Sequence, residues 1–216
     1  MIRAVIFDID GTLMDTNYLH VEAFSRAFRE IGRDVPRSAI HKQIGKGSDL
    51  LLPVLLGADK DAAERADRRH SEIYAELEER AYPLPGAKEL LASLAARRIP
   101  AWLATSAKPE QLEFLLGALE AEGKIAGVVS SGDVEASKPE PDIFAAALER
   151  AGCAADEAVV VGDTVWDVIA ATKAGVRTVG VLTGGAFSRA ELEEAGTVAV
   201  YQDCAELLAS GFPDGL

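Results

Sequence analysis

Four acidic residues stand in two pairs that could act together as metal ligands and proton carriers. Asp8 and Asp10 are separated by one residue and are followed by Gly11, which permits a tight turn. Asp163 and Asp167 lie four residues apart in the second half of the chain. If the fold brings three or four of these carboxylates together, they cannot all stay ionised without a cation. The set therefore indicates a hard metal ion with oxygen ligands, and Mg²⁺ is the ion that we expect.

Hydroxyl and amino groups that could hold a phosphate occur in two further segments. Thr105 and Ser106 follow an apolar run, and Lys138 precedes a proline-rich segment typical of a helix start. Each feature alone has an ordinary structural explanation: a helix cap for Thr105 and Ser106, a solvated side chain for Lys138, and a turn for Gly162-Asp163. Their joint occurrence in this order, each after a strand-like run or before a helix, makes coincidence improbable.

Short apolar runs rich in β-forming residues recur along the chain and must position these groups. Several lack polar alternation, as expected of strands that are covered on both faces. The runs are 2–7, 101–104, 127–129, 158–161, 178–181 and 198–201. Apolar residues at helical spacing fill most of the intervals, as in the stripe Ile143, Phe144 and Ala147. This order predicts an α/β fold, a doubly wound parallel sheet that binds ligands at the carboxyl ends of its strands.

One long segment, residues 16–81, interrupts the alternation of strands and helices. It carries helical patterns and no convincing strand, and prolines 83 and 85 mark the return to the sheet. We therefore expect a small helical cap of residues 16–81, inserted into a core made of residues 1–15 and 82–216. Hinges would lie near 15–17 and 82–85, where the helical pattern stops.

Within the insert, Gly45-Lys46-Gly47-Ser48 is a cationic loop flanked by glycines. It lacks the first glycine of a nucleotide-binding loop, because Ile40 occupies that position, and we reject such a site. The insert is placed to reach over the strand ends, so this loop would suit an anionic or hydroxylated leaving group of the substrate. We expect Lys46 to contact that leaving group. His20, His41 and His70 have no metal-ligand spacing, and we expect them to be surface or structural residues.

Composition narrows the class of protein. With 49% hydrophobic and 26% charged residues, the 216-residue chain has globular rather than disordered composition. Its net charge of −13 repels nucleic acid and anionic membranes, so neither is an expected partner. No apolar stretch approaches the roughly 20 residues of a membrane span, and the N-terminal run does not resemble a signal peptide. We expect a cytoplasmic protein whose two cysteines form no disulfide framework.

The motifs resemble those of the haloacid dehalogenase superfamily of phosphotransferases, and in particular its members with a small helical cap after the first strand. The resemblance extends over essentially the whole chain and is nearest to phosphoglycolate-phosphatase-like and β-phosphoglucomutase-like members. The matching segments are Asp8-Ile9-Asp10-Gly11-Thr12 for the first motif, Thr105 for the second, Lys138 with Pro139-Glu140-Pro141-Asp142 for the third, and Gly162-Asp163 with Asp167 for the fourth.

This resemblance implies a Mg²⁺-dependent phosphatase that acts on a small phosphorylated metabolite through an aspartyl-phosphate. Asp8 would be the nucleophile. Asp10 would protonate the leaving alkoxide and then activate water, while its main-chain carbonyl helps to bind the metal. Asp8, Asp10 and Asp163 would hold Mg²⁺.

The same resemblance implies the remaining roles. Thr105, the backbone N–H of Ser106 and Lys138 would bind the phosphoryl group, which needs positioning and charge stabilisation above all. Asp167 would position Lys138 or metal-bound water, and Gly11 and Gly162 would support the two acidic turns. Lys108 resembles a phosphate-contacting lysine of the mutases, although a surface position at a helix start explains it equally well.

Two alternatives remain open at this stage. A β-phosphoglucomutase-like enzyme would share the first step but return the phosphoryl group to a sugar. A regulatory protein would bind a phosphorylated ligand without turnover, although a pure binder needs no second acid such as Asp10. That acid also argues against dehalogenases, transport ATPases and phosphonatases, whose first motif lacks it. The sequence does not determine the oligomeric state or the physiological substrate.

Overall fold

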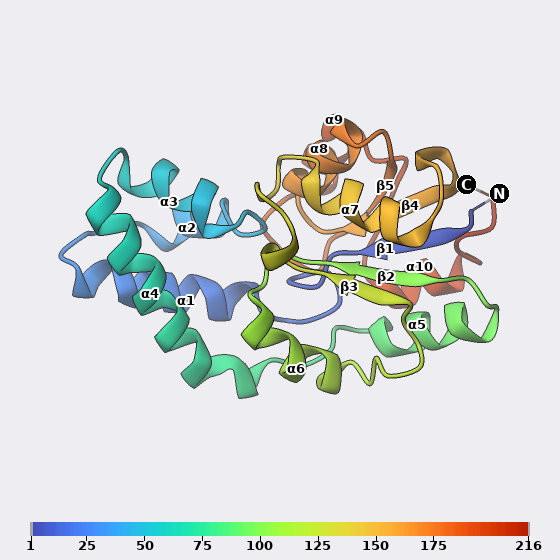
Figure 1. Cartoon of the computed structure of the whole chain (residues 1–216), viewed down its shortest axis with the longest axis horizontal. Helices are drawn as coiled ribbons and strands as arrows, with labels where there is room; N and C mark the ends of the chain where they lie inside the picture. The colour runs from blue at the N-terminus through green and yellow to red at the C-terminus, as the bar shows by residue number, and fades with distance from the viewer. Residues whose placement is uncertain (1, 216) are drawn as a thin grey trace.

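A six-stranded parallel sheet forms the centre of the chain in the computed structural model, which describes residues 2–215 (Figure 1). The strand order is β3-β2-β1-β4-β5-β6, the order of a doubly wound sheet. Each of the six expected runs forms a strand. Their bounds are β1 Ala4–Phe7, β2 Ala101–Ala104, β3 Gly127–Val129, β4 Ala158–Gly162, β5 Arg177–Val181 and β6 Ala199–Tyr201.

Helices cover both faces of this sheet, because successive side chains of each strand point to opposite faces and both sets are apolar. Val5 and Phe7 of β1 pack with leucines of α5, α6 and α10, whereas Ile6 packs with α7 and α8. The bounds are α5 Ala87–Ala96, α6 Pro109–Ala118, α7 Asp142–Ala151, α8 Val165–Lys173, α9 Arg189–Ala195 and α10 Cys204–Ala209. Figure 1 shows the two helical layers above and below the strands.

The winding order reverses at β1, which lies between β2 and β4. Phe7 at the end of β1 is in register with Leu103 of β2 and with Val161 of β4. Residues that follow these three strands therefore leave the sheet side by side at one edge. The fold thus brings together segments that are about 150 residues apart in the sequence, including the turns after Phe7 and Val161.

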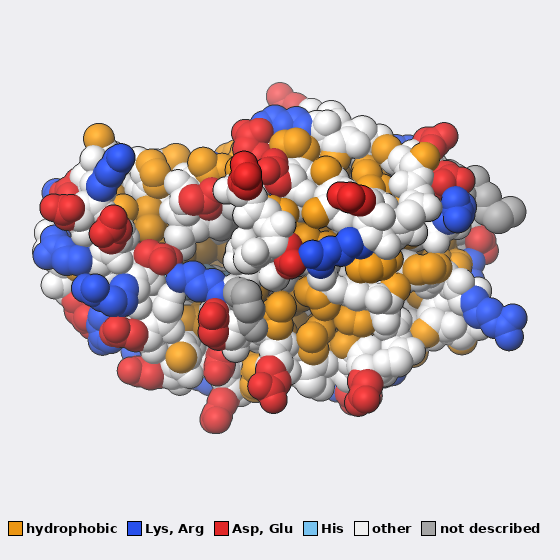
Figure 2. All heavy atoms as spheres, viewed as in Figure 1, with side chains coloured by type: hydrophobic (Ala, Val, Ile, Leu, Met, Phe, Trp, Pro, Cys, Tyr) orange, Lys and Arg blue, Asp and Glu red, His pale blue; other side chains and the backbone are white. Residues whose placement is uncertain are grey.

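The first four of the helices that lie between β1 and β2 form a separate layer beside the sheet (Figure 1). They are α1 Asn17–Glu30, α2 Arg37–His41, α3 Ser48–Leu56 and α4 Lys60–Leu77, and a short 3₁₀ turn follows at Glu78–Arg80. Apolar side chains of α1, including Phe24 and Phe28, are buried against α3 and α4. Lys, Arg, Asp and Glu side chains are interspersed over the outer face of this layer, as Figure 2 shows at left. We refer to these helices as the insert.

The two chain segments that enter and leave the insert run next to each other. The N–H of Asp15 donates to the carbonyl of Tyr82 at 2.9 Å, and the N–H of Leu84 donates to the carbonyl of Leu13 at 2.9 Å. The insert is therefore joined to the sheet by a paired, antiparallel connection. Within the described part of the chain, no helix is both long enough and apolar enough to cross a bilayer.

Candidate active site

Lys138 joins two carboxylates at the edge of the sheet. Its Nζ donates to Asp8 Oδ1 at 2.5 Å and to Asp167 Oδ1 at 2.8 Å, and all three side chains are buried. Asp8 follows β1, Asp167 lies in the first turn of α8, and Lys138 precedes α7. Burial disfavours the charged lysine, but the charges of Asp167 and Asp8 outweigh it and raise the pKa of Lys138. Lys138 is therefore a fixed cation beside Asp8.

The start of α8 fixes the position of Asp167. Its Oδ2 accepts hydrogen bonds from the N–H of Thr164 at 3.0 Å and from the Thr164 hydroxyl at 2.6 Å, which caps the helix. A Cβ on Gly162 would lie 2.6 Å from the Asp167 Cβ, so the close approach of strand and helix requires glycine there. The same residues that end β4 and begin α8 thus aim Asp167 Oδ1 at Lys138.

Asp163 completes a group of three buried carboxylates with Asp8 and Asp167, in which each residue offers an oxygen within 4.8 Å of the others. Asp163 Oδ1 accepts from Thr12 Oγ1 at 3.0 Å, and Oδ2 accepts from Asn17 Nδ2 at 3.1 Å. Burial and the nearby charge of Asp167 raise the pKa of Asp163 to about 7. Burial and neighbouring carboxylates also raise the pKa of Asp8, against the opposing effect of Lys138.

The charge of this group fits a cation. Three carboxylates face one ammonium, so negative charge is in excess in a buried space where it is poorly solvated. The donors are carboxylate oxygens, the ligands that Mg²⁺ prefers. The residues present therefore fit a magnesium ion.

Asp10 lies apart from the three-carboxylate group and makes different contacts. Its Oδ1 accepts from Thr16 Oγ1 at 2.7 Å and lies 3.4 Å from His20 Nε2, while Oδ2 accepts from Thr105 Oγ1 at 3.2 Å. Burial raises the pKa of Asp10, but the hydrogen bond and charge of His20 and the bond from Thr16 outweigh it and lower the pKa to about 2. These surroundings favour the carboxylate form of Asp10, and among the described residues no hydrogen bond or ion pair joins it to Lys138.

Two histidines of the insert form a pair next to Asp10. His20 Nδ1 lies 3.2 Å from His70 Nε2, and the rings stack on aromatic neighbours, His20 on Tyr74 and His70 on Phe24. Burial, together with the nearby charges of His20 and Lys108, lowers the pKa of His70 well below its usual value. We expected surface or structural histidines, and both residues do pack in the insert, but they also line a cavity at Asp10. Their spacing from Phe24 and Tyr74, four residues each, is the signal that places them on buried helix faces.

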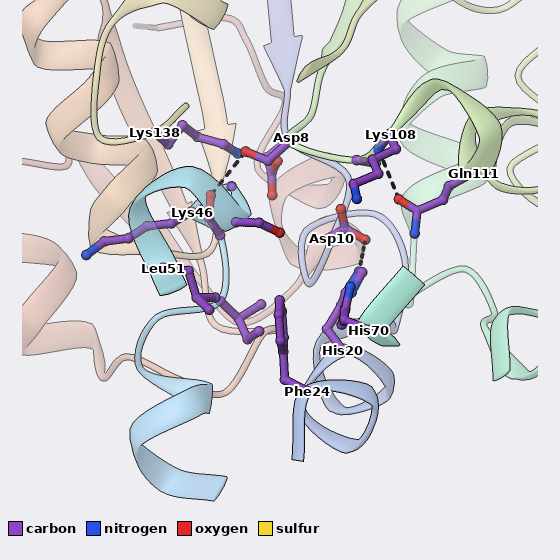
Figure 3. A pocket seen from close by; sticks show the side chains of 16 residues that line it. Asp8, Asp10, His20, Phe24, Lys46, Leu51, His70, Lys108, Gln111 and Lys138 are labelled. Carbon is purple, nitrogen blue, oxygen red and sulfur yellow. Dashed lines mark hydrogen bonds and ion pairs between the residues drawn. The ribbon is translucent and has the colours of Figure 1, made fainter. Parts of the chain in front are cut away.

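Figure 3 shows this cavity between the sheet edge and the insert. The volume within which a water-sized molecule can be centred is about 60 Å³. Asp8, Asp10 and Lys138 line it from the core. His20, Phe24, Leu51 and the Gly45–Ser48 loop line it from the insert, and Lys108 and Gln111 line it from the start of α6. A small substrate bound here would touch both layers.

Of the phosphate-binding candidates, Ser106, Lys108 and Lys138 line the same cavity, whereas Thr105 is buried beside it against Asp10. Thr105 Oγ1 also accepts from the N–H of Ala107 at 3.0 Å, and Ser106 Oγ donates to the carbonyl of Gly45 at 3.3 Å. Lys108 Nζ donates to Asp67 Oδ2 at 2.9 Å and Ser71 Oγ at 2.8 Å, both in α4. Thr105 thus lies against Asp10, whereas Ser106 and Lys108 contact the insert directly.

Lys46 lies at the cavity wall, but its amino group is directed elsewhere (Figure 3). Nζ lies 3.7 Å from the centroid of the Trp166 ring in α8 and donates to Gln43 Oε1 at 2.7 Å. Partial burial lowers the pKa of Lys46. The ammonium therefore contacts the core beside the cavity, which is a different environment from the leaving-group contact predicted from the sequence.

Comparisons with known proteins agree with this arrangement. Residues 5–181 match the family model described as haloacid dehalogenase-like hydrolase. The chain is 32% identical to a phosphorylated carbohydrates phosphatase of Thermotoga maritima, over 93% of this chain and 94% of the relative. It is 33% identical to a phosphoglycolate phosphatase of Rhodospirillum rubrum, over 96% and 90%. The crystal structure of a hydrolase from Pseudomonas syringae superposes with a TM-score of 0.89 at 36% identity, covering 96% of each chain.

Proposed function

The chain belongs to the haloacid dehalogenase-like hydrolase family, and we propose that it is a Mg²⁺-dependent phosphatase of a small phosphorylated metabolite, a phosphoglycolate-like or sugar-phosphate-like monoester. The observation that carries the proposal is that one cavity contains two carboxylates with different hydrogen-bond partners. Asp8 pairs with Lys138, whereas Asp10 lines the same cavity, accepts a hydrogen bond from Thr105 and makes no hydrogen bond or ion pair with Lys138 among the described residues. One carboxylate can attack phosphorus while the other moves a proton.

In the first step, an oxygen of Asp8 attacks the phosphorus of the ester and the bond from phosphorus to the leaving oxygen breaks. The leaving alkoxide takes a proton from Asp10, which is the proton that Asp10 removed from water in the second step of the preceding turnover. The products are a free alcohol and an aspartyl-phosphate on Asp8. Lys138 and the Thr105–Ser106 segment stabilise the negative charge on the phosphoryl oxygens.

In the second step, Asp10 is a carboxylate and removes a proton from water as that water attacks the phosphorus. The bond from Asp8 to phosphorus breaks, which releases inorganic phosphate, returns Asp8 to a carboxylate and leaves Asp10 protonated for the next turnover. The hydrogen bonds from Thr16 and His20 favour the ionised form of Asp10 that this step requires.

Asp8, Asp163 and the main-chain carbonyl of Asp10 would hold Mg²⁺, with Asp167 beside them. When bound, the ion supplies positive charge that offsets the carboxylates and polarises the phosphoryl group. Excess chelator should abolish phosphate release, and added Mg²⁺ should restore it. Ca²⁺ should substitute poorly, because its coordination is looser and takes more ligands. Full activity in excess chelator would contradict the metal assignment.

A panel of phosphate monoesters tests the function directly. We expect Mg²⁺-dependent release of inorganic phosphate, fastest from small esters such as phosphoglycolate or short sugar phosphates. A sugar-phosphate mutase would instead interconvert isomers and require a bisphosphate, and a non-catalytic binder would release no phosphate from any ester. A cytoplasmic location stays a prediction from the sequence.

A further inference from the structure

Asn17 links the first helix of the insert to the carboxylate group, and the sequence analysis missed it. The residue opens α1 and is 1% exposed. Its Nδ2 donates to Asp163 Oδ2 at 3.1 Å and to the carbonyl of Gly184, in the loop after β5, at 3.2 Å. A single amide thus holds one of the three carboxylates and the loop beside it.

The orientation of this amide follows from its partners. Asp163 and the Gly184 carbonyl are both acceptors, so the NH₂ end must face them, because a flipped amide would set its oxygen against two oxygens. Asn17 Oδ1 is then left buried, with no hydrogen-bond partner among the described residues. An unpaired buried acceptor is costly, so it points to a donor that belongs to a bound ligand.

The surrounding backbone leaves this pair little freedom. A Cβ on Gly184 would lie 1.6 Å from Asp163 Oδ2, and a Cβ on Gly11 would lie 2.2 Å from Asn17 Nδ2. Only glycine fits at either position while the Asn17–Asp163 contact exists. The contact is therefore built into the fold at the edge of the three-carboxylate group.

We propose that Asn17 is a positioning residue for the magnesium site, and the inference rests on the proposed function. Its Nδ2 holds Asp163 Oδ2, whereas Asp163 Oδ1 lies 3.0 Å from Thr12 Oγ1, a hydroxyl that also lies 3.5 Å from Asp8 Oδ2. Oδ1 is therefore the oxygen of Asp163 on the side of Asp8. Its own Oδ1, which has no partner among the described residues, would accept a hydrogen bond from a water of the bound ion, since Mg²⁺ usually keeps several of its waters. Asn17 belongs to α1, so it also ties the insert to the metal site.

Calorimetric titration of Mg²⁺ into the metal-free protein tests this role without measuring activity. Removing an outer-shell partner typically weakens metal binding by about 10- to 100-fold, and we expect that loss for Asn17→Ala. His41→Ala is the matched control. His41 Nε2 also lies 3.1 Å from the Gly184 carbonyl and its ring packs against Tyr18, but among the described residues no hydrogen bond or ion pair joins it to Asp163. We expect its Kd for Mg²⁺ to stay within about twofold of wild type, below any outer-shell loss.

The outcomes separate the inference from the proposed function. Unchanged Mg²⁺ affinity in Asn17→Ala, or an equal loss in both variants, would overturn the positioning role while leaving the phosphatase proposal intact. A wild-type protein that binds no Mg²⁺ would overturn the proposed metal site itself. If Asn17→Ala does not fold, Asn17→Ser is the second variant, because serine suits a helix start but is too short to reproduce both amide contacts. A purely structural role would lower the Tm of the metal-free protein and leave the Kd unchanged.

Discussion

The strand-end cluster, made of Asp8, Lys138, Asp163 and Asp167, differs from the facing surface of the insert in how firmly its side chains are held. At the strand ends, Asp8, Asp167 and Lys138 satisfy one another, and their positions follow from strands and helix starts that are buried on all sides. On the insert, His20, His70 and Lys46 reach the cavity from two helices and a loop, and a buried nitrogen, His70 Nδ1, has no partner among the described residues. Fixed geometry suits the reacting phosphoryl group, whereas the insert is the part that can differ with the leaving group.

Several contacts between the two regions are polar, although Leu19 of α1 also packs against the apolar core of the sheet. The N–H of Gly47 donates to Ser137 Oγ at 3.0 Å, and Lys42 pairs with Glu191 at 2.9 Å on the surface. Exposed ion pairs contribute little stability, about 0–1 kcal/mol each. Such surface pairs therefore add little to the cost of separating the insert from the core, a motion that substrate entry and product release would use.

The largest effect should come from the strand-end cluster. Asp8→Asn should fold like the wild type and release no measurable phosphate from any ester, because an amide is a very poor nucleophile toward phosphorus. Steady-state phosphate release, with circular dichroism as the folding control, checks this. Turnover of even about one tenth of wild type would contradict nucleophilic catalysis by Asp8.

Lys138→Met should reveal how strongly this cluster depends on its one ammonium. The change leaves Asp8 and Asp167 buried without their cation, which typically costs about 3–5 kcal/mol of the free energy of unfolding. Urea unfolding of the metal-free protein measures it. Lys173→Met is the control, because Lys173 makes an exposed pair with Glu140 and its loss should cost no more than about 1 kcal/mol. Equal losses in the two variants would mean that the buried pair has no special role.

Sequence reasoning succeeded where residue order alone determines position. Residues after β1 and β4 must converge once the sheet is doubly wound, so the meeting of Asp8, Asp163 and Asp167 followed from the pattern. The start of the first strand was predicted too early. We expected it at Ile2, but it begins at Ala4, the residue paired with Ala158 of β4. Pairing partners, which the sequence does not display, decide such boundaries.

The insert was predictable as a set of helices but not in its contacts. The direction of the Lys46 amino group depends on where Trp166 of α8 lies relative to the loop, which is a property of packing between distant segments. The contact of Asn17 with Asp163 likewise joins residues 146 positions apart. Helical periodicity identifies a buried face, but it does not identify what that face meets.

The histidine pair should make the stability of the insert sensitive to mild acid. His70 faces His20, Lys108 and Asp10, and its folded-state pKa is lowered, so the unfolded chain binds a proton below about pH 6.5 that the folded ring does not. Stability from this group is therefore lost as pH falls below about 6.5. His70→Phe keeps the ring stack and removes the titration. Between pH 6 and pH 5, its free energy of unfolding should rise by about 1 kcal/mol relative to wild type, as measured by urea unfolding. Parallel pH curves for the two proteins would contradict this reading.

The smallest effect concerns Lys46. A sequence-based reading predicts that Lys46→Ala impairs kcat/KM for the best physiological ester much more than for p-nitrophenyl phosphate. The contact with Trp166 predicts instead an equal loss of a few-fold on both esters, since a partly exposed cation–π contact contributes about 0.5–1 kcal/mol. We expect the equal loss. Lys108→Ala, measured on the same two esters, is the comparison. If only Lys46→Ala lost kcat/KM selectively for the physiological ester, Lys46 would have a role in leaving-group recognition after all.

Trapping the covalent intermediate tests the central claim most directly. The wild-type protein with Mg²⁺ is mixed with an ester carrying a ³²P-labelled phosphoryl group, quenched in acid within a single turnover, digested, and its labelled peptide identified. We predict transient label on the peptide that contains Asp8, stable in acid and lost in base as an acyl-phosphate is, and no label in Asp8→Asn. Label on another residue, or rapid phosphate release by the wild type with no labelled protein at any time, would contradict the account.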